Sequence, residues 1–231
     1  MAEHPILFDA EMVRAIRDGR KTQARRVVKP QPPHWMARQI ETGFRKVRPV
    51  DGNLWGAFAA AGPAAVCQSE NMIRCPYGQP GDLLVPRTTW AVGRVLDHTR
   101  PLDLPPITPE RFWSCWDGPE KPIWCGKSRP GRFLPKTMWH LLPRLEVLSV
   151  RYEQVQEIGK DGRKAHDVLA EGISRAAIQQ EVEWFHPDDA PAIAFTGLWD
   201  STYAKRGYGW AANPWVWVVE FSRQEPEGGE A

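Results

Sequence analysis

The sequence has no long hydrophobic run, and its first residues predict no secretory leader. No stretch approaches the ~20 apolar residues that a membrane-spanning helix needs, and the first four residues lead directly into an apolar segment of only four, residues 5–8. The formal net charge is only +2, so binding to nucleic acid would require a local patch of positive charge. These absences predict a cytoplasmic protein without a membrane partner.

Paired cysteines and the common catalytic motifs are also missing. The four cysteines in 231 residues lack the C-x-x-C spacing of a zinc site and do not resemble a disulfide framework. The six histidines form no ligand-spaced pair, and the chain contains neither a phosphate-binding loop nor a Gly-x-Ser-x-Gly elbow. We therefore expect no metal and no cofactor.

Positive charge is concentrated in one short stretch near the N-terminus. Residues 5–8 are typical of a strand, Asp9 can cap a helix, and Gly19 fits the left-handed position at which that helix would end. Between Arg14 and Lys29 there are seven basic residues and one acid, Asp18. Taken alone, such a cluster is a solvated face or a site that attracts anions.

The remaining chain reads as one domain over residues 1–222 with two insertions, at about 30–75 and 93–135, and a flexible tail at 223–231. Both insertions lack a helical or strand period, and the second is rich in proline and tryptophan. Strands are predicted at 83–90, 143–151 and 213–221, and helices at 164–171, 174–183 and 190–205. The last strand is apolar on both faces, which is typical of a central, buried strand.

Lys21 is the residue of the basic stretch with the clearest chemical potential. Like charges on Arg20, Arg25 and Arg26 would lower the pKa of Lys21 and favour its action as a base towards a hydroxyl or a water. Glu171, at the end of a predicted helix, is one candidate for the acid partner. It is equally a surface residue near a helix end, and spacing does not select it over the other acids.

The motif Gly19-x-Lys21-x-x-Ala24-x-Arg26 resembles the Gly-x-Lys-x-x-Thr-x-Arg signature of ASCH domains, which belong to the PUA-like superfamily. Larger ASCH-like proteins of phages and prophages are similar over four ordered blocks. In this chain the blocks are Gly19 to Gln23, Cys75 to Asp82, Leu198 to Ser201 and Asn213 to Val218.

This resemblance implies an α+β fold, a six-stranded and partly open β-barrel with helices at its rim and a cleft for a nucleobase or RNA. Family members that hydrolyse N4-acetylcytidine use the signature lysine, its threonine and a later glutamate, which correspond here to Lys21, Ala24 and Glu171. Ala24 has no hydroxyl to act as nucleophile or proton relay. Phage relatives also often have a glutamate where this chain has Thr88.

Three explanations for Ala24 stay open. The protein has kept the cleft and lost hydrolysis, or it uses a water activated by Lys21 and Glu171, or the alanine was introduced to trap a bound state.

Our leading hypothesis is a phage-type protein that recognises a nucleoside, or a modified base in RNA or DNA, with reduced or lost hydrolase chemistry. The alternatives are an amidohydrolase that uses Lys21 and Glu171 on an acylated cytidine-like base, and a module that binds a protein partner through the Trp/Pro-rich insertion. The expected base-binding residues are Arg20, Lys21, Thr22, Arg25, Arg26, Arg87 and Trp90, with Trp139 and Trp210 as further stacking candidates.

Overall fold

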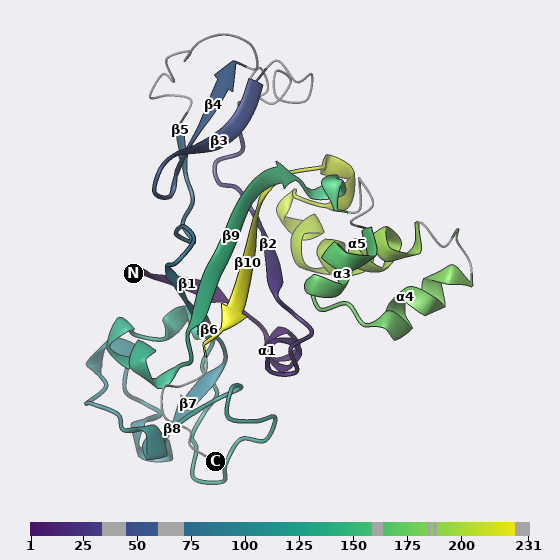
Figure 1. The fold of residues 1–231 in the computed structure, drawn as a ribbon. Coiled ribbons are helices and arrows are strands. Elements are labelled where there is room, and N and C mark those ends of the chain that lie inside the picture. The colour runs from purple at the N-terminus through teal and green to yellow at the C-terminus, as the bar shows by residue number, and fades with distance from the viewer. Residues whose placement is uncertain (34–44, 60–71, 159–163, 184–185, 187–188, 225–231) are drawn as a thin grey trace.

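The protein is described by a computed structural model that covers residues 1–231 except 34–44, 60–71, 159–163, 184–185, 187–188 and 225–231. Helices and strands are mixed around one five-stranded sheet in the described part, with the strand order β1-β6-β9-β10-β2 (Figure 1). β1 and β6 are parallel and the other neighbours are antiparallel. The strands are β1 (Glu3–Leu7), β2 (Gln23–Val27), β6 (Leu83–Arg87), β9 (Leu145–Gln154) and β10 (Trp215–Arg223).

The α+β class expected from the sequence is confirmed, but the sheet is mostly open and does not close into a barrel. β1 and β2 form its two ends in the described chain. β10 lies between β9 and β2, and its side chains pack on both faces of the sheet. Trp217 and Val219 belong to the larger apolar core and Val216 and Val218 to a second core, as the two-faced pattern of this strand predicted.

Among the described residues, four α-helices accompany the sheet: α1 (Ala10–Arg17), α3 (Lys164–Ala170), α4 (Arg175–Val182) and α5 (Ala190–Tyr203). The carboxylate of Asp9 accepts a hydrogen bond of 2.8 Å from the Met12 amide and caps α1, as expected. α3 and α5 lie beside β2 (Figure 1), where Phe195 and Trp199 of α5 pack against the valines of the second core. This packing places the end of α3 next to the start of β2.

Both expected insertions contain short regular elements between irregular segments. The first holds a three-stranded antiparallel sheet that stands apart from the main sheet (Figure 1), formed by β3 (Arg45–Asp51), β4 (Leu54–Ala59) and β5 (Met72–Arg74). The second is built from short 3₁₀ turns and a two-stranded pairing of β7 (Trp90–Val92) with β8 (Phe112–Ser114). Proline blocks regular ladders there, so buried aromatic side chains hold the segment together.

The boundaries of the expected elements shift by a few residues. The strand predicted at 83–90 divides into β6 and β7, with Thr88 and Thr89 between them. β10 extends through Arg223, into the start of the expected tail, whereas residues 225–231 lie outside the described part of the chain. Among the helices that the structure describes, none is long and apolar enough to cross a membrane.

Candidate functional site

The turn between α1 and β2 places Lys21 at a fixed position. Gly19 adopts a left-handed conformation (φ 71°), which ends the helix without the steric cost that a side chain would meet there. The amides of Arg20 and Lys21 then both donate to the carbonyl oxygen of Ala15, at 2.9 and 3.0 Å. The backbone of Lys21 next forms a bridge with Glu171, 150 residues later, so the two residues meet through the backbone as well as through their side chains.

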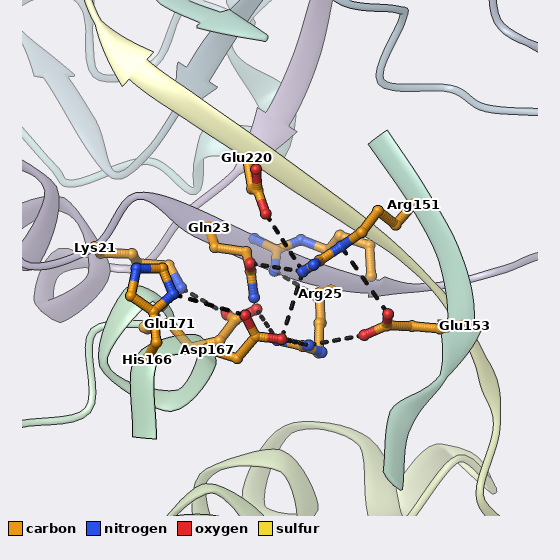
Figure 2. A network of polar contacts seen from close by, with 10 residues as sticks. Lys21, Gln23, Arg25, Arg151, Glu153, His166, Asp167, Glu171 and Glu220 are labelled. Atoms are coloured by element: carbon orange, nitrogen blue, oxygen red, sulfur yellow. Dashed lines mark hydrogen bonds and ion pairs between the residues drawn. The ribbon is translucent and has the colours of Figure 1, made fainter. Parts of the chain in front are cut away.

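Lys21 and Glu171 form a buried ion pair (Figure 2). Nζ of Lys21 donates to the Glu171 carboxylate at 2.9 Å and to the Glu171 carbonyl oxygen at 2.7 Å. The two side chains are only 2% and 5% exposed. Burial lowers the pKa of Lys21 and the nearby Arg26 and Arg25 lower it further, against the opposing effect of Glu171. The lowered pKa expected for Lys21 is present, although burial is its main cause.

Arg25 is the centre of the surrounding network, and its side chain is 1% exposed. Its guanidinium donates to Glu171 at 3.2 Å, to Asp167 at 2.9 Å and to Glu153 at 2.8 Å. Burial alone would lower the pKa of Arg25, but these carboxylates outweigh burial and raise it. The charge of Arg25 is therefore neutralised inside the protein.

A second arginine extends this network across the sheet (Figure 2). Arg151 of β9 contacts Asp167 at 3.5 Å and Glu220 at 3.4 Å, and donates to the side-chain oxygen of Gln23 at 3.0 Å. Sequence reasoning missed Asp167 as a partner of this site. The signal was present, because Asp167 precedes Glu171 by four residues and one helical turn places such residues on the same face.

Lys21, Arg25 and Glu171 belong to the wall of a cleft of about 700 Å³ beside β2. Further wall residues come from β1, α5 and the segment around Pro130. Among the described lining residues there are seven cations and two acids. The cations are Lys21, Arg25, Arg26, Lys29, Arg87, Arg132 and Arg206, the acids are Asp9 and Glu171, and the aromatic residues are Phe8, Tyr77, Phe195, Trp199 and Tyr203.

The other sequence candidates divide between the cleft and its surroundings. Arg26 and Arg87 are half-buried and line the cleft. Arg20 is exposed, pairs with Asp18 at 2.9 Å and lines a smaller neighbouring hollow. Thr22 is exposed and does not line the cleft, and its amide donates to the carbonyl of Ala170 at 2.9 Å.

Ala24 is fully buried in the larger core, opposite Val219 of β10, and is not among the residues that line the cleft. In a strand, its side chain points to the face opposite to that of Arg25. Ala24, which the resemblance aligns with the signature threonine, thus contributes an apolar contact to the core.

Trp90 is also fully buried, outside the cleft. Its ring stacks on Phe112 with 6.4 Å between centroids, and the Arg129 guanidinium lies 5.2 Å from its centroid. The stacking role expected for Trp90 therefore finds no exposed ring face in this structure. Of the other two candidates, Trp139 is nearly buried, and Trp210 packs edge-on against Phe195.

Within the described chain, no group of three or more His, Cys, Asp or Glu side chains is arranged to hold a metal ion. The chain matches no protein-family model, no curated protein and no solved structure. Chemically, the cleft offers a cationic, partly aromatic surface for an anionic planar ligand. Its wall also contains one lysine of lowered pKa in contact with a carboxylate.

Proposed function

We propose that this chain is a phage-type ASCH protein with a PUA-like fold that recognises a nucleoside, or a modified base in nucleic acid, in the cytoplasm of a host cell. The observation that supports this function most strongly is the charge of the cleft. Besides Lys21 and Arg25, which pair with Glu171, five cations and the acid Asp9 line it, although the whole chain carries a net charge of only +2. A cleft lined by one sign of charge raises the local concentration of ligands of the opposite sign.

The aromatic residues of the cleft favour a nucleobase over a simple anion. Phe8, Tyr77 and Tyr203 lie beside the cationic residues in its wall. Aromatic side chains stack on bases of any sequence, and a positively charged groove follows the phosphates. Tyr77 and Tyr203 are only partly buried, so their rings retain surface for a ligand.

Reduced hydrolase chemistry is part of the proposal, because Ala24 places a methyl group where the family signature has a threonine. A methyl group neither attacks an acyl carbon nor relays a proton. Glu171 is in addition shared between Lys21 and Arg25, which commits its carboxylate to the structure.

Binding of labelled single-stranded RNA and DNA, measured by fluorescence anisotropy over a range of salt concentrations, tests the proposal. Lys29→Glu and Arg206→Glu reverse two exposed cations of the cleft. We expect weaker binding to all sequences and a salt slope that falls by about one for each phosphate that the variant no longer neutralises. Arg17→Glu, at an exposed position outside the cleft, is the matched control. Absence of binding at low salt, or equally weakened binding in Arg17→Glu, would refute the proposal.

A second candidate function is amide hydrolysis on an N4-acylated cytidine, which the contact between Lys21 and Glu171 favours. With the proton of the pair on Glu171 and Lys21 neutral, Lys21 would take a proton from the water that attacks the acyl carbon. The C–N bond would break as Glu171 gives its proton to the leaving amine, and transfer of a proton from Lys21 to Glu171 would then restore the starting state. Turnover of N4-acetylcytidine by the native protein that is abolished in Lys21→Met would establish this function. Turnover that is unchanged in Lys21→Met would refute it.

A further inference from the structure

A second hollow of about 620 Å³ lies next to the cleft and shares Arg87 and Arg132 with it. The second insertion and the segment that follows it form most of its wall. Leu102 and Phe133 are 87% and 52% exposed there, so both leave apolar surface open to a ligand. The apolar lining comprises Pro101, Leu102, Phe133, Leu134, Pro135 and Trp139. We call this the insertion hollow.

The charged residues of the insertion hollow are cationic in excess. Arg87, Arg100, Arg132 and Lys136 line it, against the single acid Asp103 among the described lining residues. Asp103 is paired with Arg100 at 2.7 Å. The hollow therefore complements a ligand that carries negative charge beside an apolar surface.

Two of these cations lie over aromatic rings of the same hollow. The guanidinium of Arg132 is 5.0 Å from the ring centroid of Phe133, and Nζ of Lys136 is 5.7 Å from that of Trp139. Sites for single-stranded nucleic acid combine these elements, because the bases stack on aromatic rings while cations contact the phosphates. A neutral apolar ligand would gain nothing from the charges.

The junction between the two hollows is held in place by hydrogen bonds. Nε of Arg87 donates to the carbonyl of Gly131 at 2.9 Å, and its Nη2 donates to the carbonyl of Arg132. Gly131 is itself packed against the segment between β6 and β7, since a Cβ at this position would lie 2.8 Å from the backbone of Thr88. Arg87 and Arg132 are thus positioned together between the cleft and the insertion hollow.

We propose that the two hollows bind adjacent nucleotides of one strand. The cleft takes one base, Arg87 and Arg132 contact the phosphate that links it to the next nucleotide, and the insertion hollow takes that next nucleotide. This inference rests on the proposed function and narrows its ligand to a single-stranded oligonucleotide, in preference to a free nucleoside. The insertion then supplies the binding site for the second nucleotide.

Anisotropy competition with cytidine monophosphate and with a hexanucleotide tests this inference on the full chain. Phe133→Ala removes an aromatic surface of the insertion hollow, and Lys136→Ala removes a cation from it. We expect Phe133→Ala to weaken hexanucleotide binding about tenfold, with a smaller effect for Lys136→Ala, because stacking on one ring contributes about that factor. Neither Phe133 nor Lys136 lines the cleft, so the affinity of both variants for the mononucleotide should stay unchanged.

Matched controls come from the same insertion. Ile123 is 88% exposed and Lys127 is exposed, and neither lines the cleft or the insertion hollow. Ile123→Ala and Lys127→Ala should bind both ligands as the native protein does. Circular dichroism of every variant establishes that it is folded.

The outcomes separate this inference from the proposed function. If hexanucleotide binding is unchanged in Phe133→Ala and Lys136→Ala while Lys29→Glu still weakens mononucleotide binding, the inference fails and the cleft remains a base site. Equal native affinity for the two ligands likewise overturns it. If neither ligand binds at low salt, the proposed function fails as well. The inference would also be overturned if Phe133→Ala and Lys136→Ala weakened binding of an acidic aromatic peptide and left hexanucleotide binding unchanged.

Discussion

Neutralising Glu171 should destabilise the protein far more than removing the charge of Lys21. Lys21 donates to the carboxylate of Glu171 and to no other carboxylate among the described residues. Glu171→Gln would therefore leave the ammonium buried beside Arg25 without a counterion, which costs about 3–5 kcal/mol of unfolding free energy. In Lys21→Met the carboxylate keeps Arg25 at 3.2 Å, and a flexible apolar chain replaces the lysine. We expect a decrease of about 1–2 kcal/mol.

Urea and thermal unfolding monitored by tryptophan fluorescence measure this difference. For a chain of this size, each kcal/mol shifts Tm by about 2–4 °C, so Glu171→Gln should lower Tm by about 6–20 °C. The double variant Lys21→Met/Glu171→Gln should be more stable than Glu171→Gln alone, because it no longer buries an uncompensated ammonium. Glu120→Gln, at an exposed glutamate, is the control and should change Tm little.

Two results would contradict the pairing of Lys21 with Glu171. If Lys21→Met costs as much as Glu171→Gln, or if the double variant is destabilised by the sum of the two single effects, the carboxylate is not the counterion that keeps Lys21 buried. Coupling between contacting residues is normally about 0.5–3 kcal/mol in double-mutant cycles. A coupling near zero would thus refute the pairing.

Three further outcomes can be measured on the same protein. Burial holds the pKa of Lys21 below its ordinary value of 10.5. Between that lowered pKa and pH 10.5, the unfolded chain keeps a proton that the native chain has released, so the free energy of unfolding should rise with pH. Urea unfolding across this window should show that the rise is smaller in Lys21→Met. Ala24→Thr adds a methyl and a hydroxyl at a fully buried core position and should cost about 1–3 kcal/mol in the same unfolding assay; an unchanged stability would mean that the core has room for the threonine. Burial opposes ionisation of Asp82, but hydrogen bonds from the Ala2 and Gln79 amides and from His4 outweigh it and lower the pKa of Asp82. Asp82→Asn should therefore be destabilised at neutral pH, and its difference from the native protein should shrink as the pH falls through that lowered pKa.

The start of the chain was predictable because its signals are local. The Asp9 carboxylate caps α1 by accepting a hydrogen bond from the amide of Met12, three residues later. Gly19 adopts the left-handed conformation that the end of a helix favours. The alternation of residues along β10 likewise predicted a strand buried on both faces. In each case the residues that decide the structure lie within one element.

The site itself depends on contacts that no local pattern encodes. The meeting of Lys21 with Glu171 across 150 residues followed only from the family resemblance, since spacing did not distinguish Glu171 from other acids. Arg151 and Glu153 join the network because β9 pairs with β10 in one register. That register is a property of the assembled sheet.

The insertions were the least predictable part, because their order comes from packing and not from periodicity. Trp90 illustrates this, since an aromatic residue after a strand suits an exposed stacking role as well as a buried one. The structure packs it between Phe112 and Arg129.

The turn before Asp82, by contrast, has a local cause that the sequence shows. Gly78 has φ 81°, and a Cβ there would lie 2.6 Å from His4 and 2.7 Å from Asp82.

The cations of the basic stretch and of the cleft differ in their surroundings, which net charge does not show. Three carboxylates neutralise Arg25 within the protein, so its reversal to glutamate would place a fourth buried acid among them and disrupt folding before it altered binding. Lys29 and Arg206 are exposed at the cleft and can attract a phosphate at little cost to stability. A charge reversal therefore tests recognition only at such exposed positions, and the same reversal at Arg25 tests the fold.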